Sequence, residues 1–398
     1  MRLALLLILS IFSLRLFAQN TPAKWYKGNT HTHSYWSDGN DFPEMIMDWY
    51  KTHGYDFISL SDHNTIADEE KWKLLPAHPF GQRRFQEYLE KYGRQWVTYK
   101  TDSSGRISVK LKKFKEYQPL FQEPGKFLIM PAEEISAEYQ KKPIHLGAIN
   151  VQELIKPQTG NSVTEVMQNN LDAVYAQRQR TGHPMFPHIN HPNFRYAIKL
   201  EDMIHLKGER FFEVYNGHPE VHNYGDSVSM SMEELWDKLL IHYLKQGKPL
   251  LYGLATDDAH NHLEYKIGTS NPGRGWIMVK ANELSPRALI EAMERGDFYA
   301  STGVTLTEIA LERNRLEVEV KPEAGINYTI QFWGANKNAD GIKQGGKLLK
   351  EVKGTAGEYK LRKKDLFVRA KIISSKPKEN PYKQGDLETA WTQPVVAK

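Results

Sequence analysis

Residues 29–39 read NTHTHSYWSDG and place two histidines, His31 and His33, two positions apart at the predicted end of a strand. Successive side chains of a strand point to opposite faces, so both imidazoles project to one side and can bind one cation, with Zn–N distances of about 2.0 to 2.1 Å. Asp38 follows within the same stretch. A His-x-His pair standing alone is more often two polar loop histidines, so a metal site requires further ligands elsewhere in the chain.

Acidic residues and histidines recur after other apolar stretches of the chain. Residues 55–60, 127–130 and 250–254 each precede such a cluster, and PHINHP occupies 187–192. In parallel β/α barrels the C-terminal strand ends meet at one mouth, so these clusters are expected to converge. Strand alternation favours Asp258 over Asp257 as the residue that faces the site. The candidate ligands from these clusters are His63, Glu134, His191, Asp258 and His260.

Short apolar stretches alternate with helix-like patterns from Tyr26 to about Thr302. This rhythm predicts a parallel β/α architecture. Further predicted strands are 144–149 and 211–215, and the predicted helices are 43–53, 162–180, 232–246 and 285–295. Ser162, Ser231 and Ser285 are suitable N-cap residues for the last three helices.

Two segments depart from this rhythm. Residues 72–122 are charged and contain a predicted hairpin, with strands 96–101 and 107–111 joined across DSSG, and we interpret the segment as an inserted lid or rim. From Gly303 onward apolar residues alternate with period two, which predicts a small all-β sandwich over 303–398. The barrel domain is therefore expected to span 19–302.

Composition limits the classes of protein and partner. The chain has 398 residues with 40% hydrophobic content and no cysteine, so any metal ligands must be His, Asp or Glu. Residues 1–18 have a basic start and an apolar run too short to cross a membrane, which predicts a cleaved secretory signal and a periplasmic or secreted protein without a stable membrane span. The remaining net charge of about +3 does not favour nucleic-acid binding.

Taken together, these motifs resemble those of the PHP family, the polymerase and histidinol phosphatase superfamily, over about residues 25–302. The matching pieces are His31-Thr32-His33 with Ser37-Asp38-Gly39, Ser61-Asp62-His63-Asn64, Pro131-Ala132-Glu133-Glu134-Ile135-Ser136, His191-Pro192, Asp258-Ala259-His260, and His145. The resemblance implies a distorted seven-stranded β/α barrel that holds two or three divalent metal ions, commonly Zn, Mn or Fe.

The same resemblance assigns ligands position by position. It implies that His31, His33, Glu134 and Asp258 hold one ion and that Glu134 bridges to a second ion held by His145 and His191. A third position would use Asp38, His63 and His260, and its occupancy is open because some relatives have histidine in place of Asp38.

The expected activity is phosphate-ester hydrolysis by a metal-bound hydroxide, with a small phosphomonoester favoured over a diester as substrate. Asp38 or His260 could protonate the leaving oxygen, and Arg195 and Arg274 could bind phosphate, although a surface or structural role is equally expected for each arginine. One alternative is an amidohydrolase-like enzyme. Another is a protein with an inactive barrel whose sandwich contacts glycan or cell wall.

Overall fold

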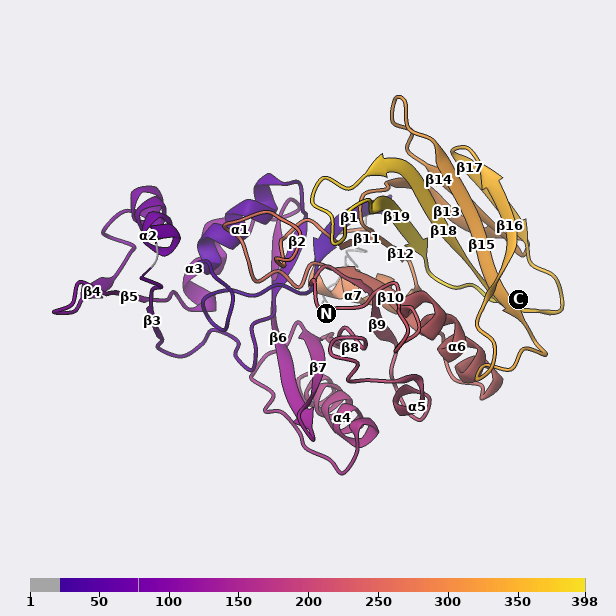
Figure 1. Ribbon diagram of the computed structural model, residues 1–398, viewed down its shortest axis with the longest axis horizontal. Coiled ribbons are helices and arrows are strands. Elements are labelled where there is room, and N and C mark those ends of the chain that lie inside the picture. The colour runs from indigo at the N-terminus through magenta and orange to yellow at the C-terminus, as the bar shows by residue number, and fades with distance from the viewer. Residues whose placement is uncertain (1–21, 78, 398) are drawn as a thin grey trace, which may run out of the picture.

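The computed structural model describes residues 22–77 and 79–397. The predicted signal segment, 1–18, lies outside these residues. Most strands belong to one large sheet, and a second all-β region follows it toward the C-terminus (Figure 1). No helix within the described residues combines the length and apolarity needed to cross a bilayer. The mixed α/β class predicted from the sequence is confirmed.

The large sheet has thirteen strands in the order β10-β9-β8-β7-β6-β2-β1-β11-β12-β19-β18-β15-β16. The first nine strands in this order carry the candidate ligands or lie beside strands that do. Helices and apolar side chains pack against both faces of this part of the sheet. Their bounds are β1 Lys24–Asn29, β2 Phe57–Leu60, β6 Leu128–Tyr139, β7 Lys142–Ile149, β8 Phe186–Ile189, β9 Phe211–Asn216, β10 Tyr252–Thr256, β11 Trp276–Ala281 and β12 Phe298–Ser301.

The strand directions correct the predicted all-parallel arrangement. The pairs β1–β2, β2–β6, β8–β9 and β9–β10 are parallel, but β7 runs antiparallel to both β6 and β8, and β11 runs antiparallel to β1. The apolar residues 144–149 form the second arm of a hairpin with β6, because only two residues separate the strands and no helix fits between them. Strands β10 and β11 share no ladder in the described residues, so a closed seven-stranded barrel is not confirmed.

Within the described residues, the four predicted helices are present to within one residue at each end, and three further helices were not predicted. All three serine caps are confirmed, since the Ser162, Ser231 and Ser285 hydroxyls accept hydrogen bonds from the backbone three residues later. The bounds are α1 Pro43–Thr52, α2 Pro79–Tyr92, α3 Phe114–Phe121, α4 Val163–Thr181, α5 Leu200–Met203, α6 Met232–Lys245 and α7 Pro286–Arg295.

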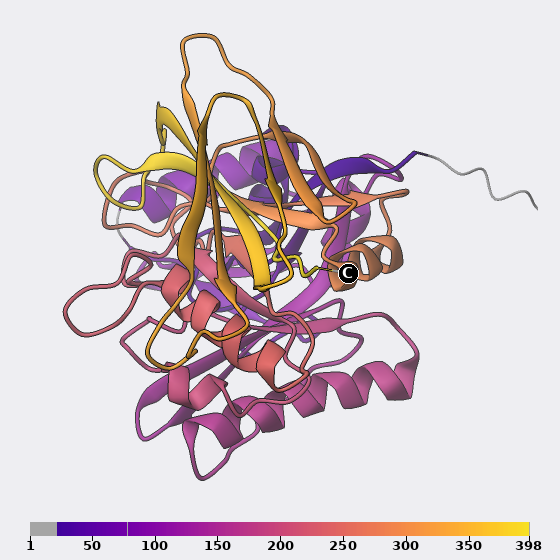
Figure 2. The ribbon, with the colours of Figure 1, turned by 90° about the vertical axis from the view of Figure 1, so that its right-hand side faces the viewer.

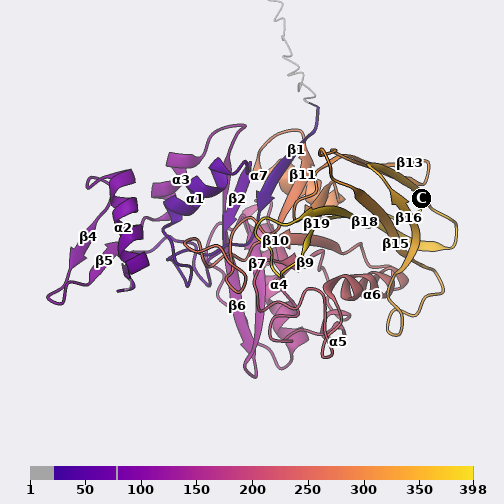
Figure 3. The same ribbon diagram turned by 45° about the horizontal axis from the view of Figure 1, so that its top comes forward.

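Within the segment 72–122, β3 Trp72–Leu74, α2, β4 Tyr99–Thr101 and β5 Ile107–Lys110 form a small layer at one end of the molecule, whereas α3 packs beside α1 against the large sheet (Figures 1 and 3). The predicted hairpin is present, with β4 antiparallel to β5, and β3 pairs with the other edge of β5. Its role as a lid stays a prediction.

The C-terminal strands form two layers at the opposite end, which Figure 2 views from the front. Side chains of the sheet β13-β14-β17 share one core with those of β15 and β18, as the alternating pattern predicts. The second layer continues the large sheet, because β19 pairs with β12. The division at residue 303 therefore stays a prediction. The bounds are β13 Leu306–Glu312, β14 Arg315–Val320, β15 Tyr328–Asn336, β16 Lys347–Lys353, β17 Ala356–Lys360, β18 Asp365–Pro377 and β19 Leu387–Thr392.

Candidate metal centre

All nine residues predicted as metal ligands lie together. Their ligand atoms form four overlapping groups, and within each group all atoms lie within 4.8 Å of one another. The groups share His31, His33, His63 and Glu134, so they make one continuous centre. Its members are His31, His33, Asp38, His63, Glu134, His145, His191, Asp258 and His260.

Backbone pairing between loops brings these residues together. The loops after β1 and β10 lie side by side, since His33 N donates to Ala259 O at 2.9 Å and Asp258 N donates to His31 O at 2.9 Å. A parallel bridge joins His63 to Glu134 in the same way. Glu134 does not end its strand as expected but lies inside β6, because β6 continues into the hairpin with β7 that carries His145.

The inner part of the centre is almost fully buried. Asp258 Oδ1 lies 3.2 Å from Nε2 of both His31 and His33, and Glu134 Oε1 lies 3.4 Å from His31 Nε2. Glu134 Oε1 also lies 3.2 Å from His191 Nε2 and 3.1 Å from the ring nitrogen Nδ1 of His145. Glu134 therefore touches several imidazoles at once, which is the geometry expected of a bridging ligand.

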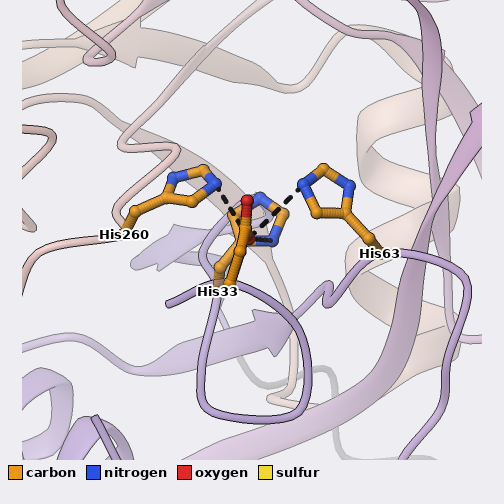
Figure 4. Close-up of side chains that lie close together, drawn as sticks. His33, His63 and His260 are labelled. Atoms are coloured by element: carbon orange, nitrogen blue, oxygen red, sulfur yellow. Dashed lines mark ion pairs between the residues drawn. The ribbon is translucent and has the colours of Figure 1, made fainter. Parts of the chain in front are cut away.

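The outer part is built around the carboxylate of Asp38, and Figure 4 shows the three imidazoles that surround it. Asp38 Oδ1 lies 3.2 Å from His260 Nε2, 3.5 Å from His63 Nε2 and 3.9 Å from His33 Nδ1. The Asp38 side chain is 59% exposed, whereas that of His33 is fully buried. The outer group therefore faces solvent, where a substrate can reach it.

The side chains fit a bound cation. His31 Nδ1 lies 2.7 Å from a carboxylate oxygen of Glu213, and since a carboxylate only accepts, Nδ1 carries a proton and Nε2 is the nitrogen left to bind a metal ion or a second proton. Nε2 faces the carboxylates of Asp258 and Glu134. An unprotonated Nε2 and these carboxylate oxygens are all acceptors, and they repel one another unless a cation or proton lies between them. Their separations of 3.2 and 3.4 Å match the distance of roughly 3.3 Å between tetrahedral ligands of one Zn²⁺.

Buried atoms without hydrogen-bond partners mark the same place. His31 Nε2, His33 Nε2, Glu134 Oε2 and His145 Nδ1 are buried and make no hydrogen bond. Buried polar atoms are rarely left unsatisfied, so four of them in one centre indicate a missing ligand. Burial alone would lower the pKa of His31, and the carboxylates of Asp258, Glu213 and Glu134 more than reverse this effect.

Glu213 is the important residue that sequence reasoning missed. It lies inside β9, is fully buried and orients His31 from behind. It also accepts hydrogen bonds from His191 N and Asn216 Nδ2, both at 2.8 Å. A carboxylate that fixes the ring of a metal-ligating histidine is a regular feature of metal sites. The available clue was a glutamate within the otherwise apolar stretch FFEVY at 211–215.

Neighbouring acids support the loops rather than the centre itself. Asp257 accepts hydrogen bonds from Tyr50 OH at 2.8 Å and from the backbone of Arg274 at 2.6 Å. Asp62 accepts from the Ser34 backbone at 2.8 Å and from Ser37 Oγ at 2.6 Å, which holds the loop that carries Asp38. These contacts place Asp257 outside the four ligand groups, as strand alternation predicts.

The two arginines predicted to bind phosphate lie elsewhere. Arg274 is 1% exposed, and its guanidinium donates to Gly217 O at 2.8 Å and Lys266 O at 3.0 Å. Its predicted contact with substrate stays a prediction, although the two carbonyls bind both terminal nitrogens of the guanidinium. Arg195 is 66% exposed and forms an ion pair with Glu220 at 3.3 Å. Neither arginine contacts a candidate metal ligand.

No protein-family model and no curated protein matches the chain. Similarity to solved structures is found. A two-domain protein from Bacteroides vulgatus that contains a predicted PHP-like metal-dependent phosphoesterase is 15% identical, with a TM-score of 0.40 over 94% of this chain and 96% of its own.

Two further structures show weaker similarity. A candidate metal-dependent phosphoesterase from Bifidobacterium adolescentis is 13% identical, with a TM-score of 0.27 over 58% of this chain and 87% of its own. An amidohydrolase from Chromobacterium violaceum is 12% identical, with a TM-score of 0.27 over 59% of this chain and 87% of its own. At these identities and TM-scores the similarity does not indicate a substrate.

Proposed function

We propose that the protein is a metal-dependent hydrolase of the PHP type that cleaves phosphate esters, with small phosphomonoesters favoured. The observation that carries the proposal is the convergence of nine His, Asp and Glu side chains, four of which present buried atoms without a hydrogen-bond partner. A centre built only from nitrogen and oxygen ligands suits Zn, Mn or Fe.

The resemblance to the PHP family suggests how two or three ions would be shared, whereas the four groups place His191 with His31 and Asp258, and His145 with His63 and Glu134. His31, His33, Glu134 and Asp258 would hold the innermost ion, and Glu134 would share a second with His145 and His191. Asp38, His63, His33 and His260 form the outer group. Divalent ions in such a centre would supply an activated water at neutral pH and would neutralise charge on the phosphoryl oxygens.

When no ion occupies the outer group, His260 is the better proton donor of the two residues predicted for that role. Its Nδ1 lies 2.9 Å from Asp258 O and therefore carries a proton, while its Nε2 faces the exposed side of the centre beside Asp38. Burial would raise the pKa of Asp38, but hydrogen bonds from His260 and His63 hold it well below its ordinary value. Asp38 therefore stays ionised and serves as ligand or base rather than as acid.

Hydrolysis assays on the purified, metal-loaded protein test the proposal. We expect turnover of p-nitrophenyl phosphate with Zn, Mn or Fe, slower turnover of bis-p-nitrophenyl phosphate, and none of amide substrates. His33→Gln should lower the rate at least about 100-fold, while His205→Gln, a change at an exposed histidine, should not. Absence of phosphate-ester turnover with each of the three metals would refute the proposal, and turnover of amides alone would favour the amidohydrolase alternative.

A further inference from the structure

A second cavity, of about 700 Å³, lies where the C-terminal strands meet the large sheet. Its walls come from β1, α1, the loop between β10 and β11, and the connection between β18 and β19. None of the nine candidate metal ligands lines it. Its volume falls within the range typical of small-molecule sites, so the cavity can hold a ligand of one or two rings.

Four aromatic side chains form one part of the wall: Trp49, Tyr55, Tyr265 and Trp276. Neighbouring rings are not parallel, since Trp49 is inclined at 46° to Tyr55 and at 30° to Tyr265, and Tyr55 is inclined at 74° to Trp276. The Lys27 ammonium covers one face of Tyr55 and one of Trp276, and His53 stacks on one face of Trp49. The other face of Trp49 and the ring of Tyr265, which is 46% exposed, offer separate platforms that suit the C–H faces of a puckered ring.

The remaining wall mixes hydrogen-bond donors with acceptors. Lys27 supplies a donor and Glu379 and Glu388 supply acceptors, whereas Asn380 Nδ2 donates to Pro272 O and the Thr302 hydroxyl is bonded to the backbone of Thr389. Hydroxyl groups both donate and accept, so a mixed wall of this kind suits a ligand rich in hydroxyls. The other two lysines of the wall, Lys266 and Lys378, are paired with Glu264 and Asp386, so the two glutamates disfavour a ligand with two negative charges.

Lys27 is the distinctive charge in this cavity. Its Nζ lies 3.9 Å from the centre of the Tyr55 ring and 4.2 Å from that of Trp276. Among the described residues it forms no ion pair, although the charges of Asp257 and Asp56 also act on it. Lys378 differs, because its Nζ lies 3.7 Å from Asp386. Burial lowers the pKa of Lys27 to about 8, which leaves it mainly charged at pH 7. A desolvated ammonium with no carboxylate partner favours an anionic ligand.

We propose that this cavity binds a sugar that carries one carboxylate, with the sugar ring on the aromatic platforms and the carboxylate at Lys27. The proposal takes up the glycan contact expected for the C-terminal region but places it at the junction with the large sheet. It does not depend on the hydrolase activity.

Saturation-transfer NMR titrations of the full chain test the proposal, with D-glucuronate, D-glucose, glucose 6-phosphate and AMP as probes. We expect saturable binding of D-glucuronate and at least about tenfold weaker binding of D-glucose, the factor that one charge-assisted hydrogen bond supplies. Lys27→Met should weaken D-glucuronate binding by a similar factor. Lys27→Arg should retain most of the binding, and so should Lys24→Met, a change at an exposed lysine of the same strand.

Several outcomes would overturn the proposal. These are the absence of saturable D-glucuronate binding, equal binding of D-glucose, tighter binding of glucose 6-phosphate or AMP, and unchanged affinity in a folded Lys27→Met protein. If Lys27→Met does not fold, the comparison between D-glucuronate and D-glucose on the unmodified protein decides. Phosphate release from glucose 6-phosphate, followed in parallel, reports on the proposed hydrolase separately.

Discussion

Replacing Glu213 with glutamine tests whether the buried carboxylate behind His31 supports a metal centre. Glu213 accepts four hydrogen bonds of 2.7 to 2.8 Å, two on each oxygen. Glutamine has the same shape but only one acceptor oxygen, so its amide nitrogen faces two donors whichever way it is turned. With the nitrogen in the place of Oε1, the Thr256 hydroxyl can rotate to accept from it, so at least one buried donor, His31 Nδ1, stays unpaired at a cost of about 1 to 3 kcal/mol of folding free energy. The four donors are His31 Nδ1, Thr256 Oγ1, His191 N and Asn216 Nδ2.

The same change should weaken metal binding, because the carboxylate keeps His31 Nδ1 protonated and turns Nε2 toward the other ligands. Loss of such a contact typically lowers metal affinity about 10- to 100-fold, which corresponds to about 1.4 to 2.7 kcal/mol. Competition with a chromophoric chelator measures Zn²⁺ affinity directly, and circular dichroism shows whether the variant is folded.

Glu133→Gln is the matched control. Glu133 is buried next to Glu134 in the chain, accepts a hydrogen bond from Ile155 N at 2.7 Å, and has its pKa raised to about 8 by burial. It is therefore mainly protonated at neutral pH, and glutamine resembles the protonated form. We expect the control to keep its Zn²⁺ affinity. A folded Glu213→Gln protein with unchanged affinity, or an equal loss in the control, would refute the reasoning.

Three further outcomes are expected. Arg369→Met should destabilise the protein by about 3 to 5 kcal/mol in urea unfolding, because the change leaves the Asp237 carboxylate buried and unpaired. Arg369 now binds this carboxylate through two hydrogen bonds of 2.7 and 3.0 Å. A loss below about 1 kcal/mol would contradict the prediction. Burial raises the pKa of Glu209 from 4.5 to about 8, so the stability that its protonated form contributes is complete below pH 4.5 and is lost as pH rises toward 8. The stability of Glu209→Gln minus that of the unmodified protein should therefore be larger at pH 8 than at pH 5. An equal difference at both pH values would argue against this. Chelator treatment of metal-loaded protein should lower its melting temperature, which zinc addition should restore, and an unchanged melting temperature would show that no ion is held.

Local features of the fold could be predicted because they depend on neighbours in the sequence. The caps at Ser162, Ser231 and Ser285 satisfy backbone groups three residues away. The hairpin 96–111 and the period-two strands after Gly303 are likewise local patterns. Strand direction was missed at β7, since an apolar run of six residues reads alike in parallel and antiparallel sheets.

The nine candidate ligands could be selected from sequence because His, Asp and Glu after apolar stretches stand out individually, and their motifs resemble those of one family. The role of Glu213 could not be predicted from sequence, and neither could the internal hydrogen bonds of Arg274. Both depend on partners far away in the chain. The sequence by itself therefore determined which side chains are available to bind metal and where most elements begin. Only the tertiary structure decided their distances, their burial and the cavity at Lys27, because these arise when segments separated by more than a hundred residues pack together.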